Sequence, residues 1–266
     1  MKKCINLLMI VLLAVLAGAC GGKNDAVLKA QIESGKKHCP MNLGMAGKLT
    51  SMSYDDKTRE VEFVITLNKQ MTDVNELKAD PENAKEMMRL ALSKGNMKKL
   101  VDMMVDADAS LKVTYKNRGS KDDFSIQFPA EEIKNISENP MSEEDTNKLL
   151  LSTQLKSEKK KLPYSIDRGL KVTGIEDNGS SLVYVCEVDE DLYDMPDMEK
   201  SKAELKENMG KMLKDRSMRQ QAEVLASLKK GFEYRYVGKS SGNTVTVAFT
   251  PDELADIAAT GGHKRR

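Results

Sequence analysis

Apolar residues recur along this chain with two different periods, and the two periods alternate twice. In residues 61–67 and 182–188 every second position is apolar, which is typical of a β-strand with one buried face. In residues 81–107 and 197–230 the apolar positions lie three and four apart, which predicts helices with one apolar stripe. Lys94-Gly95-Asn96 predicts a break in the first of these segments, with Asp215-Arg216-Ser217 as its weaker counterpart in the second. The order of these segments is the same in both halves, so the pattern predicts two units of similar construction.

Each unit is completed by shorter segments of the same two kinds. A helix is expected before each first hairpin, over residues 27–37 and 143–161, and a second hairpin over 111–128 and 232–249. A closing helix is expected from Pro129 and from Thr250, where Thr250 and Glu253 have the spacing of a capping box. The predicted fold class is therefore α+β: two tandem homologous α-ββ-α-ββ-α units, each a mostly antiparallel sheet with helices packed on it.

The two units also match residue by residue. A shift of 121 positions superposes identical residues such as Asp73 and Asp194, Lys85 and Lys206, and Phe128 and Phe249. Before residue 55 the shift becomes 123, and the two-residue difference lies where a hairpin turn is expected. The second turn has Asn178-Gly179, which favours a two-residue type I′ hairpin. An insertion confined to a turn is expected of an internal duplication. The predicted repeat domains are residues 27–140 and 141–259, and a basic tail follows at 260–266.

The first twenty residues have the features of an export signal. Lys2 and Lys3 precede an apolar run that ends at Ala19, which is too short to span a bilayer as a helix. The run ends Leu16-Ala17-Gly18-Ala19-Cys20 and is followed by Gly21-Gly22. This segment resembles a bacterial lipoprotein signal, although the family prefers leucine where Ala17 stands. The alternative is an ordinary secretory signal that is cleaved near Ala19.

The resemblance implies a signal peptide at 1–19 and, at 20–26, a lipidated cysteine with a flexible linker. Cys20 would carry acyl chains such as palmitate and become the new N-terminus. The anchor would then be lipid, not a spanning helix. The short signal, the glycine linker and the lysine- and methionine-rich body are similar to envelope lipoproteins of gut Bacteroidota. By analogy we expect a place in the cell envelope, with the outer membrane preferred over the inner membrane.

Composition limits the remaining function classes. The chain has 42 Lys+Arg against 41 Asp+Glu, so it lacks the basic surplus that nucleic-acid binding requires. Tryptophan is absent and there are only two histidines, His38 and His263, which argues against stacking of sugars and against acid–base or metal chemistry. We find no phosphate-binding loop, nucleophile elbow or metal-ligand spacing, and we expect neither a cofactor nor a metal.

Two cysteines and four methionines remain as candidate site residues. Cys39 and Cys186 could pair as a disulfide or provide a thiol, but Cys186 lies in the apolar series of its strand, where it is most simply a core residue. Methionines occupy matching positions in the two long helical segments: Met88, Met97, Met209 and Met218. They favour core packing, with an apolar groove as the alternative.

The sequence therefore predicts a lipid-anchored envelope protein that is not an enzyme. We expect its duplicated domains to act as a binding or assembly module for an envelope protein partner. The alternative is a lipoprotein that holds a small apolar ligand in a methionine-lined pocket. Neither interpretation involves nucleic acid, and both involve the membrane only through the N-terminal lipid.

Overall fold

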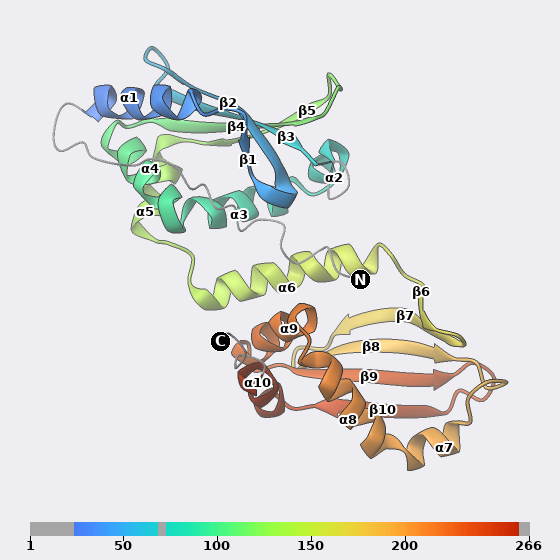
Figure 1. The fold of residues 1–266 in the computed structure, drawn as a ribbon. Helices are drawn as coiled ribbons and strands as arrows, with labels where there is room; N and C mark the ends of the chain where they lie inside the picture. The colour runs from blue at the N-terminus through green and yellow to red at the C-terminus, as the bar shows by residue number, and fades with distance from the viewer. Residues whose placement is uncertain (1–23, 69–72, 261–266) are drawn as a thin grey trace. The chain divides into compact units, whose positions relative to one another are not determined.

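The computed structural model describes residues 24–68 and 73–260. The chain divides into two compact units that meet between Ser142 and Glu143 (Figure 1). We call them unit 1 and unit 2 and describe each by itself. Both are α+β, as the sequence predicts, and each contains one five-stranded mixed sheet that is mostly antiparallel.

Unit 1 begins with a helix, and its sheet is interrupted by three consecutive helices. The elements are α1 (Asn24–Lys36), β1 (Met41–Asn42), the short 3₁₀ helix Gly44–Ala46, β2 (Gly47–Asp55), β3 (Glu60–Leu67), α2 (Val74–Ala79), α3 (Pro81–Leu92), α4 (Gly95–Asp106), β4 (Ser110–Asn117), β5 (Asp123–Phe128) and α5 (Ala130–Glu138). The strand order is β1-β2-β3-β4-β5, so β1 and β5 form the edges. Only the central β3–β4 pair is parallel, because helices α2–α4 return the chain to the same end of the sheet.

Unit 2 repeats this plan. Its elements are α6 (Glu143–Lys159), β6 (Tyr164–Asp167), β7 (Leu170–Asp177), β8 (Ser181–Val188), α7 (Met195–Lys200), α8 (Lys202–Leu213), α9 (Arg216–Ser227), β9 (Gly231–Gly238), β10 (Thr244–Phe249) and α10 (Pro251–Thr260). The order β10-β9-β8-β7-β6 again has one parallel pair, β8–β9. The β-bulge also recurs, between Leu49 and Ser51 in unit 1 and between Val172 and Gly174 in unit 2.

Local sequence explains where the helices begin and end. The predicted break at Gly95 separates α3 from α4, and the corresponding break at Asp215 separates α8 from α9. The capping box is confirmed: the Thr250 N–H donates to Glu253 Oε2 at 2.8 Å and the Glu253 N–H donates to Thr250 Oγ1 at 3.2 Å. Two residues after the end of α4 and of α9 stands a residue with positive φ, Asp108 (50°) and Lys229 (55°).

Each unit has its own hydrophobic core between its helices and one face of its sheet. In unit 1, Leu28 and Ile32 of α1 pack with Val101 of α4 and with alternate residues of β3 such as Val61 and Phe63. In unit 2, residues of α6, α9 and α10 pack against Leu182, Tyr184 and Cys186 of β8. In Figure 1 helices α8–α10 lie on one side of the unit 2 sheet. The other face of each sheet is formed by the alternate strand residues.

Four details differ from the sequence prediction. Helix α1 begins at Asn24, so the last three residues of the expected 20–26 linker are helical. Helix α2 and strands β1 and β6 were not predicted, because they are six residues or shorter. Helix α7 begins two residues before the predicted segment 197–230 and is separated from α8 at Ser201. The type I′ turn at Asn178-Gly179 is wrong. Gly179 has a φ of 93°, but Asn178 does not have positive φ, and its side chain instead accepts the Ser180 and Ser181 N–H groups.

Candidate functional site

The predicted anchor residue cannot be placed. Cys20 and the signal at 1–19 lie outside the described residues, and so do residues 261–266 of the basic tail. Among the residues that the structure describes, no helix is both long and apolar enough to cross a membrane. No group of three or more His, Cys, Asp or Glu side chains in the same part of the chain could hold a metal ion.

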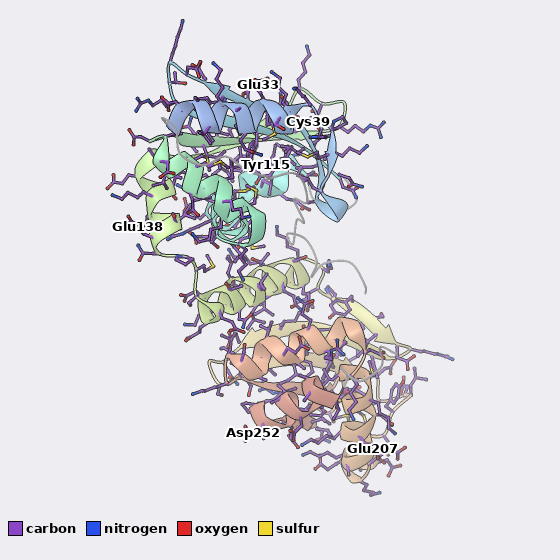
Figure 2. All side chains as sticks on the ribbon, turned by 60° about the vertical axis from the view of Figure 1, so that its left-hand side comes forward. Glu33, Cys39, Tyr115, Glu138, Glu207 and Asp252 are labelled. Atoms are coloured by element: carbon purple, nitrogen blue, oxygen red, sulfur yellow. The ribbon has the colours of Figure 1, made fainter. Side chains whose placement is uncertain are left out.

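The two predicted thiol residues are separate free cysteines, Cys39 in unit 1 and Cys186 in unit 2. Cys39 follows the end of α1 (Figure 2) and directs Sγ to the Gly35 carbonyl at 3.9 Å. Burial raises the pKa of the Cys39 thiol, and it raises the pKa of Cys186 to about 12. Since the thiolate is the nucleophile, both positions disfavour nucleophilic chemistry at neutral pH.

The four predicted methionines lie in or against the two cores. Met88 and Met209 are buried, and Met97 and Met218 are partly buried against the same clusters. The Tyr236 hydroxyl approaches Met209 Sδ at 3.8 Å. These contacts are those of core side chains. The apolar groove stays a prediction that no contact of these residues supports.

A matched lysine site appears in both units. Lys85 of α3 lies 2.8 Å from Glu132 of α5 and 5.3 Å from the centre of the Phe128 ring. Its counterpart Lys206 of α8 lies 2.6 Å from Glu253 and 5.3 Å from the Phe249 ring. The shift of 121 residues had already superposed these lysines and phenylalanines. The same three groups meet in both units, so we assign this contact to the scaffold. It joins α3 to β5 and α5 in unit 1, and α8 to β10 and α10 in unit 2.

Unit 2 contains a polar cluster inside its core. The Tyr184 hydroxyl of β8 donates to Glu158 Oε2 at the end of α6, and Gln221 Nε2 of α9 donates to the Tyr184 hydroxyl at 3.2 Å. Gln154 Nε2, one helical turn before Glu158, donates to Glu158 Oε1 at 2.9 Å. Gln221 is only 3% exposed. Every polar side chain of this cluster therefore has a partner, which is the condition for placing polar groups in a core.

Tyrosine rings extend the cluster across the sheet. Tyr234 stacks on Tyr184 at 5.4 Å and on Tyr236 at 6.1 Å between ring centres. Burial raises the pKa of Tyr236 to about 12, and burial followed by the Glu158 charge raises the pKa of Tyr164 to about 12. Burial and then Glu158 also raise the pKa of Tyr184. The phenols thus keep their protons at neutral pH, so they can donate hydrogen bonds but cannot act as bases.

The sheet face opposite the core carries polar residues in unit 1. We call it outer face 1, and its residues are Lys48, Glu62, Val64, Thr66, Lys112, Thr114, Ser125 and Gln127. At its centre Glu62 accepts from Lys112 Nζ at 3.0 Å and from Thr114 Oγ1 at 3.2 Å. Thr114 also shares a hydrogen bond of 3.0 Å with Ser125. The centre of this face is therefore an acidic residue that neighbouring donors surround.

The corresponding surface of unit 2, outer face 2, has the opposite arrangement. Its residues are Lys171, Glu176, Val183, Val185, Glu187, Glu233, Arg235, Val237, Thr246 and Ala248. Val183 replaces Glu62 at the centre and is fully buried. Glu176 and Glu233 are its partners in the two neighbouring strands, and Arg235 reaches Glu176 at 3.6 Å and Glu233 at 4.0 Å. The guanidinium therefore bridges two acids beside an apolar centre.

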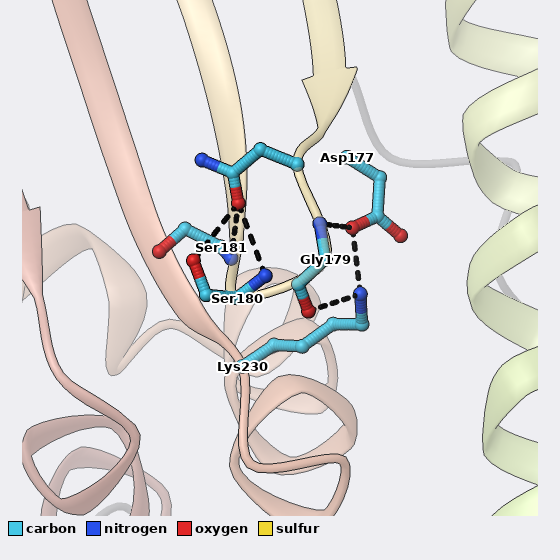
Figure 3. Close-up of polar contacts among 6 residues, drawn as sticks. Asp177, Gly179, Ser180, Ser181 and Lys230 are labelled. Atoms are coloured by element: carbon cyan, nitrogen blue, oxygen red, sulfur yellow. Dashed lines mark hydrogen bonds and ion pairs between the residues drawn. The ribbon is translucent and has the colours of Figure 1, made fainter.

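In unit 2 a lysine also connects the β7–β8 turn to the start of β9 (Figure 3). Lys230, which precedes β9, donates to Asp177 Oδ1 at 2.6 Å and to the Gly179 carbonyl at 2.9 Å. Burial alone would raise the pKa of Asp177, but Lys230 and the Gly179 N–H outweigh burial, and the pKa lies below its usual value. The contact ties the β7–β8 turn to β9, and we assign it to stability.

Comparison with known proteins gives this chain no family. No family model matches the chain, and no curated protein matches it. Among solved structures it is similar to a candidate secreted protein of Pseudomonas aeruginosa, with 15% identity and a TM-score of 0.35. The similarity covers 43% of this chain and 98% of that one. A likeness at this level supports no inference about function.

Sequence reasoning missed the polar cluster and both outer-face centres. Glu158, Tyr184 and Gln221 come from three elements that are far apart along the chain. One signal was available: Gln221 stands where the aligned residue of unit 1 is Leu100, on the apolar stripe of the helix. A polar residue on such a stripe indicates a buried partner.

Proposed function

We propose that this chain is a lipid-anchored protein of the cell envelope that acts by binding, not by catalysis. Its anchor is Cys20, and its outer membrane location follows the analogy to envelope lipoproteins. The observation that supports binding is that each unit packs its helices on one face of its sheet, so that outer faces 1 and 2 are formed by strand residues alone. The central strands of each face are hydrogen-bonded on both sides, which holds the side chains of the face in a fixed arrangement.

The two faces suit a protein partner. Each combines β-branched residues with a few charged groups held by neighbours, such as Lys112 on Glu62 and Arg235 between Glu176 and Glu233. Charges fixed in this way define a pattern that a complementary protein surface can match. Two faces in one chain also allow bivalent contact, in which the second binding event is intramolecular.

Site-specific photo-crosslinking in the native envelope tests this proposal. A crosslinker replaces Gln127 on outer face 1 or Ala248 at the matching position of outer face 2, both of which are exposed. Matched controls carry it at the exposed helix positions Lys99 of α4 and Lys211 of α8. We expect one envelope protein to be captured from the two sheet positions and not from the helix positions. Capture from the helix positions alone would contradict a partner on the sheet faces.

Anchoring and bivalency need their own variants of the full chain. Cys20→Ala should remove the acyl mass and release the protein from the membrane fraction. Lys112→Glu and Arg235→Glu each reverse a charge on one outer face, and with bivalent contact either should lower the apparent affinity and the pair should abolish it. An unchanged affinity in both single variants contradicts bivalency. A copurified small apolar molecule with no protein partner would instead favour the alternative ligand-binding function.

A further inference from the structure

The anchor and the start of α1 are close along the chain. Only residues 21–23 separate Cys20 from Asn24, the first residue of α1. A chain advances at most about 3.6 Å per residue, so Asn24 lies no more than roughly 14 Å from Cys20. The end of unit 1 that contains the α1 N-terminus must therefore lie next to the lipid that holds Cys20.

The contacts of α1 identify that end of the unit. Asp25 in its first turn accepts from the Tyr54 hydroxyl at 3.1 Å and pairs with Arg59 at 3.9 Å. Lys29, one turn later, pairs with Asp56. Tyr54, Asp56 and Arg59 belong to the end of β2 and to the β2–β3 turn. The helix start is thus fastened to this turn by contacts within unit 1.

The α4–β4 connection lies at the same end. Arg59 also pairs with Asp108 at 3.6 Å, and the Ser110 N–H donates to the Arg59 carbonyl at 2.9 Å. We call the group Asp25, Lys29, Tyr54, Asp55, Asp56, Lys57, Arg59 and Asp108 the anchor-side surface. The β4–β5 turn, with Lys121, lies at the opposite end of the strands, as Figure 1 shows.

We propose that the anchor-side surface rests against the lipid headgroups and that the strands of unit 1 lead away from the bilayer. This inference rests on the proposed lipidation of Cys20. The surface has three basic groups, Lys29, Lys57 and Arg59, against four acidic ones, Asp25, Asp55, Asp56 and Asp108, so it has no basic surplus. The Asp25, Asp56 and Asp108 carboxylates are already paired with Lys29 or Arg59. The surface therefore has no requirement for anionic lipid.

This orientation has a consequence for outer face 1. Strand β3 has eight residues, which corresponds to roughly 26 Å at the usual rise of a strand. With the anchor-side surface at the headgroups, the far end of β3 stands well outside the reach of the tether. The strands of outer face 1 then run along the membrane normal. The face is therefore open to a partner beside it and is not covered by lipid.

The test uses two matched lysines in the two hairpin turns of unit 1. Lys57→Cys in the β2–β3 turn and Lys121→Cys in the β4–β5 turn are each labelled with a fluorophore, in full-length acylated protein that also carries Cys39→Ser. Both lysines are exposed, and both substitutions remove one positive charge. The protein is reconstituted into phosphatidylcholine vesicles that contain a lipid with a nitroxide quencher on its headgroup.

We expect the label at position 57 to be quenched at least about twofold more than the label at 121, because the strand length separates the two turns. Equal quenching, or stronger quenching at 121, in protein whose acyl mass and flotation with vesicles are confirmed, overturns the orientation alone. Absence of acyl mass on Cys20 overturns the anchor and the orientation together. Vesicles with and without 20% anionic lipid should give the same ratio within about twofold, since the surface has no basic surplus.

Discussion

Units 1 and 2 share a scaffold but differ in which side of the sheet has a polar residue at its centre. In unit 1 the core-facing strand positions are apolar and the outer face has Glu62 with its donors at the centre. In unit 2 the core contains Tyr184 with Glu158 and Gln221, and Val183 takes the central outer position. What remained the same is the backbone pairing and the Lys–Glu–Phe contact. The fold thus depends on these shared features and tolerates either placement of polar groups.

The exchange inside the core involves several positions at once. The aligned residues of Tyr184, Gln221 and Glu158 are Phe63, Leu100 and Gly35. In unit 1 a Cβ atom on Gly35 would lie 2.6 Å from Met52 Sδ, so Met52 occupies the space that a side chain would need. In unit 2 the matching positions hold Glu158 and the shorter Ile175. A polar group entered the core only where its partners and the space for them were also present.

Alkaline pH should separate the two units most strongly. Burial raises the pKa of tyrosines at four positions of unit 2 and two of unit 1: Tyr164, Tyr184, Tyr234 and Tyr236 against Tyr54 and Tyr115. A tyrosine whose pKa is higher in the folded chain than in the unfolded chain stabilises the fold fully at pH values below the unfolded pKa of about 10. This stabilisation is lost as the pH rises from about 10 through the pKa of the folded state. We expect unit 2 to unfold first between pH 10 and 12.

Methyl NMR of the methionines can measure this order. Met88 reports on the core of unit 1 and Met209 on the core of unit 2. The Met209 signal should move to its unfolded position at lower pH than the Met88 signal, together with the rise in tyrosinate absorbance. Loss of the native Met88 signal first would contradict the expectation that the buried tyrosines of unit 2 make it unfold before unit 1.

Exchanging the aligned pair Leu100 and Gln221 should have opposite consequences in the two units. Leu100→Gln places an amide in an apolar core without partners and should lower the free energy of unfolding of unit 1 by roughly 3 kcal/mol. Gln221→Leu removes one donor from Tyr184, which still donates to Glu158, and should cost about 1 kcal/mol or less. Urea unfolding followed through Met88 and Met209 gives both values, and equal losses would show that the polar cluster does not matter.

Removal of the shared hydroxyl should have a smaller effect. Tyr184→Phe leaves the buried Gln221 amide without its acceptor and Glu158 Oε2 without the Tyr184 donor, so unit 2 should lose about 1–2 kcal/mol. Adding Gln221→Leu to Tyr184→Phe recreates the pair found in unit 1 and should recover part of this loss. A double variant that is as unstable as the sum of the two single variants would refute the coupling.

The helix ends before β4 and β9 allow the mildest test. Lys229 has positive φ after α9, and the Lys229 and Lys230 N–H groups donate to the Ala226 and Leu225 carbonyls. Glycine adopts this conformation without strain, so Lys229→Gly should stabilise unit 2 by about 0.5 kcal/mol. Lys229→Ala keeps the Cβ atom and should give no gain. Asp108→Gly in unit 1 should gain less, because it also removes the contact with Arg59.

Much of the fold could be predicted from the sequence, because it depends on local signals. The alternation of residues 61–67, the Gly95 break and the Thr250–Glu253 capping box each act within a few residues. Because the two halves of the sequence match, an element predicted in one half supports the corresponding element in the other. The parallel β3–β4 pair was not predicted, since nothing in the two strands indicates which neighbour they choose after three intervening helices.

The candidate site was less predictable for a physical reason. The polar cluster depends on side chains such as Glu158, Tyr184 and Gln221, which meet only after the sheet and helices are packed. Period alone identifies Tyr184 as a buried strand residue and says nothing about its hydroxyl. Likewise, the contact of Arg235 with Glu176 depends on β7 lying two strands away from β9 in the sheet, which no local pattern indicates. The prediction that Cys20 is lipidated rests on the N-terminal pattern and stays a prediction.

The edge strands have a practical consequence for handling the protein. Strand β10, at the edge of the unit 2 sheet, reads Thr-Val-Thr-Val-Ala-Phe and contains neither charge nor proline, whereas edge strand β5 begins with Asp123. Uncharged edges of this composition favour pairing between copies. We therefore expect concentrated protein to self-associate through β10, and Thr246→Lys should keep it monodisperse in light scattering.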